Sequence, residues 1–171
     1  MKRKTKLRIW SLFNADETKL LRTPSEPVEL ARVSTAEFQE LIDDMFVTMR
    51  QAKGIGLAAP QVGQPIRLAI IAEEVDPQLP EPLTMINPQI VSPSLDQEVS
   101  EEGCLSIVGV FGDVQRATNI TVRAFDRAGK PYTLKATNLL ARAIQHEVDH
   151  LNGILFTDKA TIITKGQDLL S

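Results

Sequence analysis

Two histidines one helical turn apart are the first residues in this sequence that could do chemistry. They lie in Gln145-His-Glu-Val-Asp-His150, and residues four apart on a helix project from the same face. Both imidazoles can therefore reach one metal ion, for which zinc and ferrous iron are suitable. Glu147 would lie beside that ion, where a carboxylate can take a proton from an activated water. The pattern predicts metal-assisted hydrolysis, although either histidine alone would more often be a hydrogen-bonded core residue.

The only cysteine of the chain is the leading candidate for a third ligand. Catalytic metals usually take three protein ligands and keep one position for water. A single cysteine excludes an intrachain disulfide, so Cys104 is a buried filler, an incidental thiol, a nucleophile or a ligand. In Glu101-Glu-Gly-Cys-Leu-Ser106, acidic residues flank a glycine that permits close backbone approach. This setting favours a functional thiol, but the segment alone leaves a buried small hydrophobe equally open.

A run of small residues, Gly54-Ile-Gly-Leu-Ala-Ala-Pro-Gln-Val-Gly63, is the third candidate element. It is too irregular for a helix and lacks the Lys-Ser/Thr ending of a phosphate loop. Taken alone, it is best interpreted as a glycine-rich turn that ends a helix. Its small side chains would also let a ligand approach, and Gln61 could direct an amide donor into a site.

Helices and strands that could position these residues follow from the apolar spacing. Ser34-Thr-Ala-Glu37 is typical of a capping box, and the apolar residues after it predict an amphipathic helix that stops at Gly54. Strands are expected at 66–72, 83–91, 120–125 and 132–136, and the last two should form a hairpin. Residues 138–152 are apolar over so much of the helix surface that this helix should be central, ending at Gly153. Strands that surround a buried helix indicate an α+β fold.

Composition limits the classes of protein that remain. With 171 residues, 43% apolar and 24% charged, the chain fits one domain, residues 1–171, with one core. A net charge of -3 with interspersed signs argues against nucleic-acid binding. The longest apolar stretch, residues 68–72, is too short to span a membrane, and no export signal follows the basic start. We therefore expect a cytoplasmic protein.

Together and in this order, the three segments resemble the motifs of the peptide deformylase family. The matching segments are Gly54-Ile-Gly-Leu-Ala-Ala-Pro-Gln61, Glu102-Gly-Cys-Leu-Ser106 and Gln145-His-Glu-Val-Asp-His150. The similarity runs from about Thr23 to about Thr157, including the Gly-Lys-Pro sequence at 129–131. It implies an α+β fold with antiparallel or mixed sheets around the helix that carries both histidines. It also implies a hydrolase that removes the formyl group from the N-terminal formylmethionine of newly synthesised polypeptides and releases formate.

The resemblance further implies a role for each site residue. Cys104, His146 and His150 would bind the metal, and Glu147 would act as general base and acid. Gln61 and the main-chain N–H of Leu105 would form an oxyanion hole. Substrate contacts are expected at Gly54, Ile55, Gly56 and Gly103. The implied cofactor is one divalent ion, Fe²⁺ in cells, with Zn²⁺, Ni²⁺ or Co²⁺ able to substitute. The implied partners are N-formylmethionyl nascent chains near the ribosome. We expect the protein to act on them as a monomer.

Three positions near the second motif depart from the family pattern. They are Val108 and Gln115, where proline is frequent, and Phe111, where arginine is frequent. None is an expected ligand, so the departures concern the rim of the substrate site. A basic tail for ribosome docking is not evident, since only Lys159 and Lys165 follow the histidine helix.

Two other functions remain open on the sequence alone. A zinc endopeptidase also uses His-Glu-x-x-His, usually with a third His or Glu, but the chain has only two histidines and the segment around Cys104 would then be unexplained. A metal-binding relative without activity is the second alternative, although every expected chemical group is present.

Overall fold

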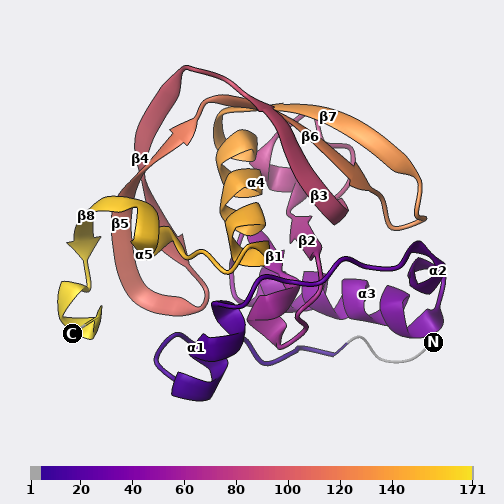
Figure 1. Cartoon of the computed structure of the whole chain (residues 1–171), viewed down its shortest axis with the longest axis horizontal. Helices are drawn as coiled ribbons and strands as arrows, with labels where there is room; N and C mark the ends of the chain where they lie inside the picture. Colours follow the sequence, from indigo (N-terminus) through magenta and orange to yellow (C-terminus); the bar gives the residue numbers. More distant parts are fainter. Residues whose placement is uncertain (1–4, 171) are drawn as a thin grey trace.

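Two antiparallel sheets organise the molecule, as the computed structural model of residues 5–170 shows (Figure 1). The five-stranded sheet has the order β1-β2-β3-β6-β7, and the three-stranded sheet has the order β4-β5-β8. In the first sheet, the strands are β1 (Gly56–Ala58), β2 (Leu68–Ile71), β3 (Leu83–Pro93), β6 (Asn119–Phe125) and β7 (Pro131–Thr137). In the second, they are β4 (Gln97–Cys104), β5 (Ile107–Ala117) and β8 (Ala160–Lys165). The α+β class is confirmed.

Helices pack against strands of both sheets. The α-helices are α1 (Ala15–Leu21), α2 (Leu30–Val33), α3 (Ala36–Gln51), α4 (Asn138–Leu151) and α5 (Phe156–Lys159), and the 3₁₀ turns are η1 (Ala59–Val62), η2 (Glu73–Val75) and η3 (Gln167–Leu170). None of the helices in the described part of the chain is long and apolar enough to cross a bilayer.

The strongly periodic elements lie where the sequence predicts them, with one correction at a helix start. The four predicted strands correspond to β2, β3, β6 and β7, and the two predicted helices correspond to α3 and α4. The cap of α3 is Thr35, whose hydroxyl accepts a hydrogen bond from the Phe38 N–H at 3.3 Å. Ser34, predicted as the cap, instead ends the short helix α2. The apolar spacing of the sequence contains no signal for that four-residue helix, so the sequence predicts the start of α3 one residue too early.

Two hydrophobic clusters meet at α4. The larger cluster contains the buried face of α3, where Phe38, Ile42, Met45 and Met49 are fully buried, and Ile144 of α4. The smaller cluster lies under the three-stranded sheet and is formed by Ile107, Val110, Val114, Leu155 and Phe156. Because α4 contacts β1 and β2 of one sheet and β5 of the other, its polar residues are held at the junction of the two clusters.

Candidate metal and active site

Three potential metal ligands converge at this junction. Cys104 is the last residue of β4, while His146 and His150 lie one turn apart on α4. Their ligand atoms all lie within 4.8 Å of one another, and Cys104 Sγ is 3.2 Å from His150 Nε2. One thiol and two imidazoles form a donor set that suits zinc or ferrous iron. The chain therefore contains a candidate metal site, and the donors fit such an ion.

Glu102 orients the first histidine. Its Oε2 lies 2.9 Å from His146 Nδ1, which leaves His146 Nε2 for the metal site. Arg116 donates to both carboxylate oxygens of Glu102 at 2.9 Å, and Arg142 donates to Oε1 at 2.9 Å. Arg116 also pairs with Asp149 of α4. Burial would raise the pKa of Glu102, but Arg116 and His146 outweigh burial, so this pKa is lowered and the carboxylate stays charged.

The two histidines have opposite pKa shifts. Burial favours the neutral form of His146, but hydrogen bonds to Cys104 and Glu102 and the charge of Glu147 outweigh burial and raise its pKa to about 10. The pKa of His150 is well below its ordinary value because of burial and the neighbouring positive charge on His146. A divalent ion held between the donors would add positive charge and oppose protonation of both rings.

Glu147 is the buried carboxylate beside this cluster. It is 4% exposed, and its Oε2 has no hydrogen-bond partner among the described residues. Burial raises the pKa of this carboxyl to about 7, with His146 acting in the opposite direction. A carboxyl group with that pKa can both accept and release a proton near neutral pH, as a general base and acid must.

Gln61 directs its amide toward the same place. It is 2% exposed on η1, and its Oε1 accepts a hydrogen bond from the Ala58 N–H at 2.8 Å. This bond turns the amide nitrogen toward the cluster, where Nε2 donates to Ser106 Oγ at 3.2 Å and lies 3.5 Å from Cys104 Sγ. Leu105 lies between Cys104 and Ser106, in the turn that links β4 to β5.

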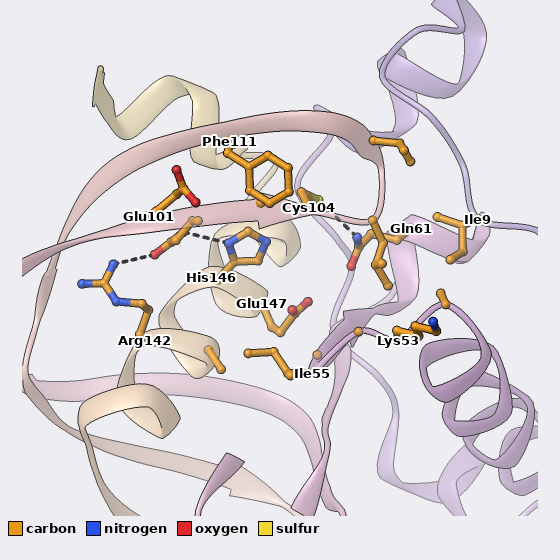
Figure 2. A pocket seen from close by; sticks show the side chains of 18 of the residues that line it. Ile9, Lys53, Ile55, Gln61, Glu101, Cys104, Phe111, Arg142, His146 and Glu147 are labelled. Carbon is orange, nitrogen blue, oxygen red and sulfur yellow. Dashed lines mark hydrogen bonds and ion pairs between the residues drawn. The ribbon is translucent and has the colours of Figure 1, made fainter. Parts of the chain in front are cut away.

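A pocket of about 680 Å³ opens over these groups (Figure 2). All the residues expected at the site line it except His150, which is 1% exposed and lies behind the lining. The residues brought together are Gly54, Ile55, Gly56, Gln61, Gly103, Cys104, Leu105, His146 and Glu147.

Two glycines are needed because other groups approach them closely. A Cβ at Gly56 would lie 2.4 Å from Glu147 Oε1, and a Cβ at Gly103 would lie 2.8 Å from the Phe111 ring. These glycines therefore make room for the carboxylate and for one wall of the pocket.

At the rim, two of the three departures from the family pattern face the pocket. Val108 lines it and is 73% exposed, and Phe111 lines it with Lys165 Nζ 5.5 Å from the ring centroid. Gln115 lies farther along β5, opposite Val99, and does not line the pocket. The rim therefore combines an aromatic ring with a nearby positive charge.

Sequence reasoning missed the charged network behind the ligands. In the sequence, Glu102 is only an acidic neighbour of the cysteine, and no local pattern marks Arg116, Arg142 or Asp149. Glu102 and His146 are 44 positions apart and meet only when β4 packs on α4. The one available signal is an acidic residue two positions before Cys104, since a cysteine that only fills a core seldom has charged neighbours.

Known proteins show the same sequence pattern and fold. The family model described as polypeptide deformylase matches residues 12–165. Peptide deformylase 2 of Xanthomonas axonopodis pv. citri is 50% identical over 138 residues, which cover 81% of this chain and 79% of that protein. The peptide deformylase of Roseiflexus castenholzii is 44% identical over 165 residues, covering 88% and 86%.

Solved structures agree with the sequence matches. A class I type b peptide deformylase from Acinetobacter baumannii superposes with a TM-score of 0.83 at 33% identity, covering 92% of this chain and 99% of that one. A peptide deformylase from Synechococcus elongatus gives a TM-score of 0.80 at 42% identity, covering 95% and 85%. The chain therefore belongs to the polypeptide deformylase family, metal-dependent hydrolases that remove the formyl group from the N terminus of nascent polypeptides.

Proposed function

We propose that Cys104, His146 and His150 hold the metal of this deformylase and that Glu147 is its general base and acid. The observation that carries the proposal is the buried Oε2 of Glu147, which has no hydrogen-bond partner in the described part of the chain and lies beside three converging ligand atoms. A buried polar group left unpaired costs free energy, so such a group is best explained by a partner that arrives with the metal or the substrate. We also take α4 as the central helix that carries the site.

Proton transfer in this site is assigned to Glu147. A divalent ion, when bound, supplies Lewis-acid activation of a water molecule and of the formyl carbonyl. Glu147 accepts a proton from the attacking water, whose oxygen bonds to the formyl carbon. Glu147 then gives the proton to the leaving nitrogen as the carbon–nitrogen bond breaks. Formate and a free amino terminus are the products.

Negative charge on the former formyl oxygen is stabilised by two donors in this proposal. They are the Gln61 amide on η1 and the main-chain N–H of Leu105 in the turn between β4 and β5. Losing one such donor typically costs ~3 kcal/mol of transition-state stabilisation. Because the Ala58 N–H holds the Gln61 side chain, its donor needs no reorientation during the reaction.

An extended peptide fits between two free strand edges. β1 pairs only with β2, and β4 pairs only with β5, so each has one edge without a strand partner in the described residues. We infer that Gly54, Ile55 and Gly56 on one side and Gly103 on the other contact the substrate backbone. The Acinetobacter relative has been solved with Met-Ala-Ser bound, which supports a methionine-first peptide in this pocket.

The metal and the cellular setting complete the proposal. A thiolate with two imidazoles suits Fe²⁺ and Zn²⁺ alike, and we propose Fe²⁺ in cells, with Zn²⁺, Ni²⁺ or Co²⁺ able to replace it. Elemental analysis after anaerobic purification identifies the ion. We further propose a monomer with a single domain over residues 1–171, acting in the cytoplasm near the ribosome on N-formylmethionyl chains and binding neither nucleic acid nor membranes.

Formate release tests this function directly. The purified protein should release formate from an N-formylmethionyl peptide and leave the unformylated peptide intact. Cleavage of internal peptide bonds without formate release would instead identify a zinc endopeptidase. The Cys104→Ala variant is the matched control, because it should lose both metal and formate release.

A further inference from the structure

A segment before the first helix connects the two loops that hold the proposed oxyanion donors. We name residues 8–12 the N-terminal strap. The Trp10 N–H donates to the Gln61 carbonyl at 2.7 Å, and the Leu12 N–H donates to the Ser106 carbonyl at 2.9 Å. The first acceptor lies on η1, and the second lies in the turn between β4 and β5. The strap thus joins η1 to the β4–β5 turn through its own main chain.

The indole of Trp10 fixes one end of this connection. Gly63 ends η1 with φ +79°, and a Cβ at that glycine would lie 2.6 Å from the Trp10 ring. The ring therefore rests directly on the backbone two residues after Gln61. Since close-packed interiors transmit small shifts, removing the ring would let η1 move.

The strap is also anchored to α1. Glu17 is 4% exposed, its Oε2 accepts a hydrogen bond from the Ser11 N–H at 2.7 Å, and Arg8 pairs with its Oε1. Two strap residues, Ile9 and Ser11, line the pocket, and Figure 2 shows Ile9 among the side chains that line it. The anchored strap therefore forms part of the pocket wall.

We propose that the N-terminal strap sets the spacing between the two oxyanion donors, with Trp10 and Glu17 as positioning residues. This inference rests on the proposed function, because it gives Gln61 and the Leu105 N–H their roles. Besides the strap, the side-chain bond from Gln61 to Ser106 also links the loops. Two donors on separate loops stabilise a transition state only when their spacing is fixed in advance, and a misplacement of about 1 Å can cost about 100-fold in rate.

Trp10→Ala tests the inference against a neighbouring control. We expect kcat for formate release to fall about 10- to 100-fold while KM stays within about threefold, because the strap acts on donors used in the transition state. Trp10→Phe, which keeps an aromatic ring at this position, should retain most of the wild-type kcat. Phe13→Ala is the matched control, since Phe13 is 52% exposed and lies outside the strap. Wild-type kcat in Trp10→Ala at normal metal content would overturn the inference.

A double-mutant cycle separates positioning from general loss of structure. If Trp10 acts through Gln61, Trp10→Ala should have little further effect on kcat in a Gln61→Ala background. Fully additive losses would overturn the inference. Glu17→Gln provides a second variant with the same expected pattern, in case Trp10→Ala does not fold.

The same measurements distinguish failure of the proposed function from failure of the inference. Absence of formate release by the wild type, or wild-type kcat in Gln61→Ala, would overturn the proposed function and the strap with it. An impaired Gln61→Ala beside unimpaired Trp10→Ala and Glu17→Gln would overturn the strap alone.

Discussion

At the scale of single residues, the clearest division of labour is between the ligands and Glu147. The carboxylate lies against Gly56 and is not needed to hold the ligand atoms together. We predict that Glu147→Gln keeps the metal but lowers kcat by at least about 100-fold, because general acid–base catalysis contributes that much or more. Metal content and formate release measured on one sample check this. Full activity in the variant would exclude Glu147 as the base.

Glu102 supports both the metal site and the fold. Glu102→Gln would leave Arg116, whose side chain is 3% exposed, without its main counter-charge. Breaking such a buried pair costs about 3 kcal/mol or more, and loss of the His146 orientation should weaken metal binding about 10- to 100-fold. Urea unfolding and metal titration measure the two effects. Glu98→Gln, at an exposed position on the same strand, is the control and should change neither.

Because the pKa of Glu102 is lowered in the folded protein, its contribution to stability depends on pH. A carboxyl whose pKa is lower when folded stabilises the protein above its unfolded pKa of about 4.3, and this contribution is lost as the pH falls further. Stability measured in the acid range should therefore fall more steeply for the wild type than for Glu102→Gln. Parallel curves would show that another carboxyl controls acid unfolding.

At the scale of elements, β1 must pass close to α4 for the site to form. Gly56→Ala would place a Cβ 2.4 Å from Glu147 Oε1 and would push the carboxylate away from the ligands. We predict a fall in kcat of about 100-fold with metal retained, since misplacement of about 1 Å has that effect. Gly129→Ala, at a hairpin turn outside the pocket lining, controls for the general cost of replacing a glycine. Unchanged kcat in Gly56→Ala would show that Glu147 has room to move.

Elements with strong local patterns were predictable, and long-range pairings were not. The i, i+4 spacing of His146 and His150 is local, so their shared face on α4 follows from helix geometry. Cys104 is a candidate third ligand as the only cysteine of the chain, but no local pattern places it beside the histidines, because the β4–β5 hairpin has no clear strand signal in its polar sequence. The contacts of Glu102 and Trp10 depend on how separate elements pack, and no spacing rule for a single segment can supply them.

At the scale of the whole molecule, the ligands come from two parts that have separate hydrophobic clusters. Cys104 packs on the smaller cluster, and α4, which carries both histidines, belongs to the larger one. A metal ion bound to all three would therefore connect the three-stranded sheet to the rest of the protein. Binding that requires the folded state stabilises it by about 2.7 kcal/mol when the free ligand is at 100 times its Kd.

Removing the metal should therefore lower thermal stability measurably. For a chain of this length, 1 kcal/mol shifts Tm by about 2–4 °C, so chelation should lower Tm by about 5–10 °C, and returning the ion should restore it. His150→Ala is the internal control, because a variant without a complete ligand set should show a much smaller shift. An equal Tm with and without chelator in the wild type, at confirmed metal loss, would mean that packing and the ion pairs of Glu102 and Arg116 hold the two parts together. The ion would then serve only catalysis.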